Sequence, residues 1–266
     1  MQLYKYEALG NDYLILDAQF SPTLPSKAII QKMCHRHYGI GSDGLLYGPL
    51  KSDKARFGLK IYNPDGSEAE KSGNGLRIFA KYLWDKALVK DEAFGIDTLG
   101  GIVDCQLDKA GEAISVGLGQ ASFLNPNFPE PETLKVGDLS LSVYPINIGN
   151  PHCIVMVDTL DKEQVLQLGP RIENHPRFPQ KTNVQFLKVI DDKTLALEIW
   201  ERGAGYTLAS GSSAGACAAL AVKLKLCKPS LSIIMPGGTL AAEVGPSYQV
   251  NITGPARAIA KIDLIF

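Results

Sequence analysis

Ser72-Gly73-Asn74-Gly75 and Ser210-Gly211-Ser212-Ser213 are the two stretches that decide the expected fold of this 266-residue chain. Each stretch follows a strand-like segment and an acidic, turn-prone connection, and each leads into an apolar segment with helical spacing. Small residues at the start of a helix let an anion approach the N–H groups of the first turn, where the helix dipole favours negative charge. One structural unit used twice is therefore predicted, with two helix starts that hold a carboxylate between them.

The segments around these stretches predict further elements. We expect strands near residues 4–6, 14–16, 58–62 and 195–200, and helices over 27–37, 77–89 and 214–226. Ser26 is the expected cap of the first helix, and Pro229 is expected to end the last one. The proline-rich residues 125–132 are expected near the crossover between two domains or in a surface loop.

Composition and charge limit the classes of protein that need to be considered. Hydrophobic residues make up 45% and charged residues 21%, and the formal net charge is -1, so neither nucleic acid nor an anionic membrane is an expected partner. No apolar run reaches the roughly 18 residues that cross a bilayer, and the N-terminus has no signal-peptide core. We therefore expect a cytoplasmic protein of two ordinary domains.

The cysteines and histidines do not predict a metal site. The five cysteines are scattered without a CxxC pair, so reduced thiols are expected. Cys34, His35 and His37 lie close in sequence, but such a cluster more often belongs to a solvated helix end or a core contact.

Two other readings of the glycine-rich stretches are weak. Residues 211–215 match the G-x-S-x-G pattern of serine hydrolases, but all four histidines precede Ser213, whereas the hydrolase histidine follows its serine. No phosphate-binding P-loop and no complete dinucleotide-binding glycine motif occurs.

A series of further motifs resembles diaminopimelate epimerase. The motifs run in the order of that family across nearly the whole chain, which makes them specific as a set. They are Gly10-Asn11-Asp12, Gly39-Ile40-Gly41-Ser42-Asp43-Gly44, Asn63-Pro64-Asp65-Gly66-Ser67-Glu68-Ala69, Gly73-Asn74-Gly75-Leu76-Arg77, Gly149-Asn150-Pro151-His152, Asn183-Val184, Glu201-Arg202-Gly203-Ala204-Gly205 and Thr207-Leu208-Ala209.

The resemblance implies an α+β fold of two pseudosymmetric domains, each a curved mixed sheet around a central helix. Residues 1–117 with a returning strand at 258–266 would form one domain, and residues 118–257 the other. The implied activity is that of an amino-acid epimerase without pyridoxal phosphate, another cofactor or a metal. In that family one cysteine from each domain faces the substrate α-carbon, and the two exchange protons with opposite faces.

The resemblance also assigns substrate-binding positions. The glycine loops, with Gly73, Asn74, Gly211 and Ser212, would hold the α-carboxylate. Diaminopimelate carries an amino group and a carboxylate at its far end, which Glu201 and Arg202 can pair. The other substrate-reading positions are Asn11, Asn63, Asn150 and Asn183. Without the motif around them, Glu201 and Arg202 would be interpreted as a surface ion pair.

Four positions depart from the family pattern, one of which is Ser213. Ser72 and Ser210 stand where the family has its two catalytic cysteines, and Tyr206 stands where it usually has a glutamate. Cys217 lies further along the helix and is expected to pack rather than react. A thiol ionises near pH 8.5 and a hydroxyl nearer water's value of about 15.7, so an unaided alkoxide at pH 7 costs on the order of 10 kcal/mol. His152 and Glu201 are candidate bases that would assist the serines.

Three explanations of the two serines remain open at this point. The serines are substitutions introduced to trap an inactive enzyme, or the chain is a divergent isomerase or dehydratase of a related amino acid, or it binds an amino acid without turning it over. The retained substrate positions favour an epimerase acting on LL- and meso-diaminopimelate, serving lysine and peptidoglycan precursor synthesis. A homodimer is the base-rate expectation.

Overall fold

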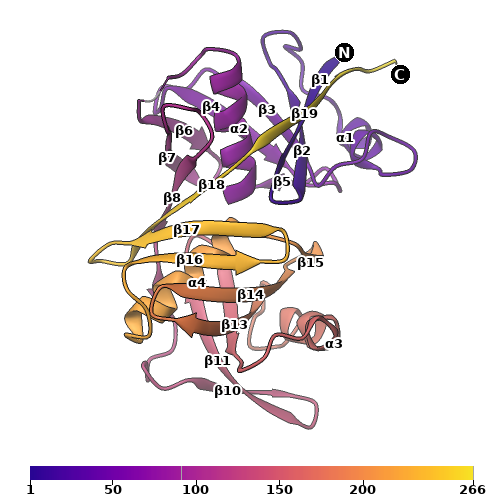
Figure 1. Ribbon diagram of the computed structural model, residues 1–266. Helices are drawn as coiled ribbons and strands as arrows, with labels where there is room; N and C mark the ends of the chain where they lie inside the picture. Colours follow the sequence, from indigo (N-terminus) through magenta and orange to yellow (C-terminus); the bar gives the residue numbers. More distant parts are fainter. Residues whose placement is uncertain (91, 266) are drawn as a thin grey trace. The chain divides into compact units, whose positions relative to one another are not determined.

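The computed structural model describes residues 1–90 and 92–265, which form two compact units. Unit 1 comprises Met1–Val116 with Gly254–Phe266, and unit 2 comprises Gly117–Thr253. Figure 1 labels the elements of both. Within the described residues, no helix combines the length and the apolar character that crossing a membrane requires.

Unit 1 is a mixed sheet with two helices. Its sheet has the order β19-β1-β2-β3-β4-β6-β7-β8, with the short β5 beside β4. The elements are β1 (Gln2–Ala8), β2 (Asn11–Leu16), α1 (Lys27–Cys34), β3 (Leu45–Leu50), β4 (Phe57–Tyr62), β5 (Glu68–Ala69), α2 (Gly73–Asp85), β6 (Phe94–Thr98), β7 (Gly101–Leu107), β8 (Ile114–Gln120), whose last residues fall in unit 2, and β19 (Arg257–Asp263).

Unit 2 is built in the same way. Its sheet has the order β10-β11-β12-β13-β14-β16-β17-β18, with β15 beside β14 and β9 beside β11. The elements are β9 (Ser122–Phe123), β10 (Glu132–Val136), β11 (Leu139–Asn147), β12 (Pro151–Met156), α3 (Lys162–Glu173), β13 (Asn183–Asp191), β14 (Thr194–Glu201), β15 (Gly205–Thr207), α4 (Gly211–Lys223), β16 (Ser230–Met235), β17 (Gly238–Val244) and β18 (Gln249–Gly254).

The two sheets follow one pairing pattern. From β19 to β8, and again from β10 to β18, successive pairs are antiparallel, antiparallel, parallel, antiparallel, parallel, antiparallel and antiparallel. In both units one helix spans the first parallel crossover and a second helix spans the other. The predicted pseudosymmetric α+β fold is confirmed, and the C-terminal strand does return to β1.

The second helix of each unit, α2 or α4, is buried inside that unit. Nearly every residue of α2 from Gly73 to Leu83 is buried, as is nearly every residue of α4 from Gly211 to Ala221. α4 is small or apolar on nearly all sides, as expected of a helix inside a protein, whereas α2 also buries the polar side chains of Asn74 and Arg77. In Figure 1 each of these helices lies among the strands of its own unit.

The starts of α2 and α4 differ from the sequence prediction. Both begin three to four residues earlier, so that the glycine-rich stretches are first helical turns and not loops. The reason is capping: the Ser72 side chain accepts from the Gly75 N–H at 3.0 Å, and the Ser210 side chain accepts from the Ser213 N–H at 3.4 Å.

Three helix ends and one cap were also predicted wrongly, and α2 ends at Asp85 rather than at residue 89. α1 ends at Cys34, and His35 Nδ1 then accepts the backbone N–H groups of His37 and Tyr38 at 3.1 Å. Ser26 precedes α1 with extended backbone angles, but its side chain makes no capping hydrogen bond. α4 ends at Lys223, well before Pro229, because Lys225 adopts a left-handed backbone with φ of 60°.

Candidate active site

The expected site residues fall into two groups, one in each unit. The group at the start of α2, the α2 site, contains Asn11, Ser72, Gly73 and Asn74, while Asn63 lies elsewhere in unit 1. The group at the start of α4, the α4 site, contains Asn150, His152, Asn183, Glu201, Arg202, Ser210, Gly211 and Ser212.

Ser72 is the N-cap residue of α2, and two hydrogen bonds hold its hydroxyl group at the start of the helix. Besides the Gly75 N–H, its Oγ accepts a hydrogen bond from the Tyr13 hydroxyl at 3.2 Å. A Cβ on Gly75 would be tightly packed here, because it would lie 3.2 Å from Ser72 Oγ and 3.3 Å from Leu46 Cδ2. The hydroxyl therefore lies at the positive end of α2, where negative charge is favoured.

A chain of amides fixes the neighbouring side chains. Arg77 donates to Asn74 Oδ1 at 2.9 Å, Asn74 Nδ2 donates to Asn11 Oδ1 at 3.1 Å, and Asn11 Nδ2 donates to Asp43 Oδ2 at 2.8 Å. A guanidinium can only donate and a carboxylate can only accept. The two ends of the chain therefore determine the orientation of both amides between them.

Arg77 is a buried cation beneath this chain. It is 0% exposed, and burial lowers the pKa of its guanidinium to about 10, which still leaves it charged at neutral pH. Its side chain also donates to the Gly73 carbonyl at 3.3 Å. The positive charge adds to the attraction of the α2 N-terminus for an anion.

Asn63 lies apart from this chain, in the exposed turn between β4 and β5. Its Nδ2 donates to Ser67 Oγ at 3.0 Å, and its backbone N–H donates to the Ser67 carbonyl at 2.9 Å. Its side chain is therefore held within the turn that the sequence predicts at 63–66.

Gly44 makes room for the side chain of Tyr13. A Cβ on Gly44 would lie 2.5 Å from Tyr13 Cε1 and would also collide with the Tyr62 carbonyl oxygen. Gly44→Ala is therefore expected to lower the free energy of unfolding by about 1–3 kcal/mol, measured by urea denaturation. Gly245→Ala is the matched control, since its Cβ would make only ordinary contacts of 3.5 Å or more. Equal stability of both variants with the parent would contradict the tight packing at Gly44.

In the α4 site, Ser210 caps the helix but is held less closely than Ser72. It is 2% exposed, its contact to the Ser213 N–H is 3.4 Å, and its Oγ lies 3.5 Å from Ser212 Oγ. Asn150 Nδ2 donates to the same Ser212 hydroxyl at 3.4 Å. Three polar groups of the predicted set therefore meet at the start of α4.

His152 is buried behind Asn150. Asn150 uses its Nδ2 to donate to Ser212, so its Oδ1 accepts from His152 Nε2 at 2.8 Å, and the proton of a neutral ring belongs on Nε2. The ring is 1% exposed, and its Nδ1 makes no hydrogen bond of normal geometry among the described residues. Burial lowers the pKa of His152 to about 3, although the nearby Gln185 side chain acts to raise it, so the ring is neutral and weakly basic at pH 7.

Asn183 and Arg202 are joined through the backbone. The Asn183 side chain donates to the Pro151 carbonyl at 2.9 Å and accepts the Arg202 N–H at 3.0 Å. The Arg202 guanidinium is exposed and donates to the Gln180 carbonyl at 3.4 Å. Glu201 is half-buried at the end of β14. This end of β14 thus carries a carboxylate and a cation on consecutive residues.

Glu173 of α3 supports that loop, which sequence reasoning missed. Its carboxylate is 5% exposed and accepts from the Gly203 N–H at 3.0 Å and from Trp200 Nε1 at 2.8 Å. The Gly203 contact lies 30 residues away in sequence, and no local pattern marks it. Tyr13, Asp43 and Gln185, whose Nε2 donates to Ser213 Oγ at 2.9 Å, were missed as supporting residues for the same reason.

Tyr206 and Cys217 do not replace the missing thiol. The Tyr206 hydroxyl donates to Glu198 at 2.7 Å, and burial together with that carboxylate raises its pKa to about 12. Cys217 is fully buried inside α4, and burial raises the pKa of its thiol well above the usual value. All five cysteines are free and buried.

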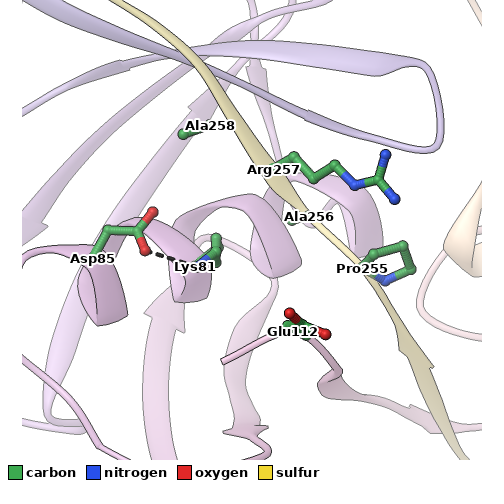
Figure 2. Close-up of a pocket in the computed structure, with 7 residues that line it drawn as sticks. All are labelled: Lys81, Asp85, Glu112, Pro255, Ala256, Arg257 and Ala258. Atoms are coloured by element: carbon green, nitrogen blue, oxygen red, sulfur yellow. Dashed lines mark hydrogen bonds and ion pairs between the residues drawn. The ribbon is translucent and has the colours of Figure 1, made fainter. Parts of the chain in front are cut away.

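Figure 2 shows a surface hollow of unit 1 that is separate from these groups. It lies beside the last turns of α2 and the start of β19, where Lys81 and Asp85 form a 2.7 Å ion pair. Ser72 lies at the opposite end of the 13-residue α2, roughly 18 Å away at 1.5 Å per residue. No predicted site residue lines this hollow.

Known structures share the fold. A hydroxyproline epimerase from Agrobacterium vitis superimposes with a TM-score of 0.76 at 14% identity, covering 98% of this chain and 91% of that one. A probable proline racemase from Agrobacterium radiobacter K84 gives 0.78 at 12% identity, covering 99% and 92%. At these identities the likeness concerns the fold alone.

Sequence relatives are much more similar. "Diaminopimelate epimerase 2" of Nostoc sp. is 46% identical over 99% of this chain and 95% of its own length. The diaminopimelate epimerase of Desulfitobacterium hafniense is 37% identical over 98% and 97%. The family model for diaminopimelate epimerase matches residues 3–124 and 144–259. The chain therefore belongs to the diaminopimelate epimerase family.

Proposed function

We propose that the protein is a cofactor-independent amino-acid epimerase that interconverts LL- and meso-diaminopimelate in the cytoplasm, for lysine and peptidoglycan precursor synthesis. The observation that carries the proposal is the serine hydroxyl at the N-cap of the buried helix in each of two equivalent units. Relatives named for this reaction match nearly the full chain.

Ser72 and Ser210 are the proposed acid–base pair. One hydroxyl group removes the α-proton and the other returns a proton to the opposite face, as the family's cysteines do. The α-carboxylate would be held at the two helix N-termini, by Gly73, Asn74, Gly211 and Ser212. The buried charge of Arg77 supports anion binding at the first of these helix starts.

The remaining polar residues are proposed to read the rest of the substrate. Arg202 is exposed and can form two parallel hydrogen bonds to the distal carboxylate, while Glu201 pairs the distal ammonium. The other proposed substrate-binding residues are Asn11, Asn63, Asn150 and Asn183.

Of the two candidate bases, Glu201 is preferred. His152 is a weak base in its buried, neutral form, and its contact with Asn150 suits a positioning role. We therefore assign His152 to orienting Asn150, and Glu201 is the proposed base that assists the serines.

Deuterium exchange tests the function. In heavy water, the protein is expected to place deuterium at the α-carbon of LL- and meso-diaminopimelate, detected by mass spectrometry, because epimerisation passes through loss of that proton. Ser72→Ala/Ser210→Ala is the control and is expected to show no exchange while still binding the substrate by calorimetry. Binding without exchange in the parent would mean an inactive binding protein.

A divergent isomerase or dehydratase of another amino acid is the second candidate. The replacement of both family thiols and of the usual glutamate by Tyr206 favours it. A panel of amino acids in the same exchange experiment decides: deuterium in a different amino acid, and none in diaminopimelate, would establish this alternative.

Two structural expectations belong to the same proposal. Residues 1–117 with 258–266, and residues 118–257, are proposed as the two domains of the enzyme. A homodimer is proposed from the prevalence of two-fold symmetric assemblies, and light scattering during size-exclusion chromatography measures it.

A further inference from the structure

The hydroxyl of Ser72 has two hydrogen-bond partners. The Gly75 N–H lies 3.0 Å from Oγ and the Tyr13 hydroxyl lies 3.2 Å from it, both as donors. A serine oxygen has two lone pairs, and these two donors occupy both. Negative charge that develops on Ser72 Oγ is therefore met by a backbone N–H and a phenol.

Packing holds the phenol at this place. Tyr13 is 6% exposed on β2, and its ring lies against Gly44, which has no Cβ to displace it. Asp12, the preceding residue, forms a 2.8 Å ion pair with Lys5 and another with Arg36. The backbone on which Tyr13 stands is thus anchored, so its hydroxyl faces Ser72 without a loop having to move.

Among the residues that the structure describes, no phenol forms a hydrogen bond with Ser210 in the α4 site. Ser210 is contacted by a backbone N–H at 3.4 Å and by the Ser212 hydroxyl at 3.5 Å. Tyr206 donates its hydroxyl to Glu198 instead. The two serines therefore differ in the acidity of the group that contacts them.

A tyrosine oxygen carries a negative charge more easily than a serine oxygen does. In model compounds phenols ionise near pH 10, and aliphatic hydroxyls nearer the value of water, about 15.7. A proton therefore leaves a phenol roughly 10⁵-fold more readily than an alcohol. A serine that passes its own proton to a neighbouring phenolate avoids carrying a full alkoxide charge.

We infer that Tyr13 is the proton-transfer partner of Ser72 in the proposed epimerisation, on which this inference rests. When Tyr13 is ionised, the hydrogen bond between the two oxygens is reversed, so Ser72 donates its hydroxyl proton to the Tyr13 oxygen and one lone pair of Oγ becomes free. In the deprotonating direction this lone pair forms a bond to the substrate α-proton while the hydroxyl proton of Ser72 passes to the Tyr13 oxygen. The electron pair of the broken Cα–H bond stays on the α-carbon as a carbanion. Negative charge thus moves from Tyr13 to the substrate, and the reverse step returns the proton to carbon.

Tyr13→Phe tests this assignment by α-proton exchange in heavy water. The variant is expected to lose roughly 10²-fold or more in exchange rate, the range of a missing acid–base group. Tyr47→Phe is the matched control, because Tyr47 is also buried in unit 1 and donates its hydroxyl to the Ser21 carbonyl at 3.0 Å. That control is expected to keep the parental rate.

A Ser72→Cys background distinguishes a role of Tyr13 in proton transfer from a purely structural role. Since a thiol ionises near pH 8.5 without a phenolate, Tyr13→Phe is expected to cost less than about threefold in a Ser72→Cys background. An equal loss in both backgrounds would show that Tyr13 only shapes the site and would overturn the inference. So would an unchanged rate of Tyr13→Phe in the parent.

Failure of the proposed function gives a different result. If the parent protein exchanges no α-proton of any amino acid, the epimerase proposal and the role of Tyr13 both fall. If the parent exchanges and Tyr13→Phe exchanges equally, only the role of Tyr13 falls.

Discussion

Ser72→Cys/Ser210→Cys is expected to exchange the α-proton of diaminopimelate about 10²- to 10⁴-fold faster than the parent protein. The pKa values of free thiols and hydroxyls differ by about 7, which corresponds to on the order of 10 kcal/mol of ionisation free energy. Only part of this difference in ionisation free energy lowers the activation barrier, because a less basic group also abstracts a proton less readily.

The same change is expected to lower stability. Ser72 and Ser210 cap α2 and α4, and sulfur accepts backbone N–H groups more weakly than a hydroxyl oxygen does. Losing an N-cap costs about 1 kcal/mol, so the double variant should unfold about 1–2 kcal/mol more easily in urea. Activity and stability should therefore move in opposite directions.

The native cysteines make the variant easy to verify. All five are buried, so a thiol reagent should react first with the two new side chains, most readily with that at position 72, which is less buried than Ser210. Alkylation should then remove the gained activity. A double variant that is folded and alkylated but no faster than the parent would show that these hydroxyls are not at the reacting centre.

The features predicted correctly from the sequence are those that depend on neighbouring residues in the chain. A serine followed by small residues can cap a helix, and two such stretches are sufficient to predict a repeated unit with a buried helix. The exact helix starts are predicted wrongly, because the glycine and asparagine of Gly73-Asn74-Gly75 favour a loop by propensity. Capping by Ser72 and burial of the turn outweigh that propensity in the folded protein.

Contacts between distant segments could not be predicted in the same way. Tyr13 and Ser72 are 59 residues apart, and they meet because β2 and α2 pack together within unit 1. Asp43 reaches Asn11 across 32 residues for a similar reason. The motifs mark which residues matter, but the sheet determines which of them touch.

The His152 side chain is expected to make the protein sensitive to acid. Its pKa is lowered to about 3 by burial, whereas a histidine in an unfolded chain has a pKa of about 6.5. Between these values the unfolded chain binds a proton that the folded protein does not, so stability falls as the pH decreases from 6.5 towards 3. By pH 4 this group should remove about 3 kcal/mol of the stability present at pH 7.

His152→Gln isolates this contribution. Glutamine can still donate to Asn150 but does not titrate, so urea unfolding at pH 7 and pH 4 should show a smaller loss for the variant, by about 3 kcal/mol. His37→Gln, at an exposed position, is expected to follow the parent. Carboxylates also titrate over this range, but they are common to all three proteins and cancel in the difference. Parallel pH dependences of His152→Gln and the parent would mean that the buried ring accepts a proton as easily in the folded protein as in the unfolded one, and His152 would then regain its candidacy as a base.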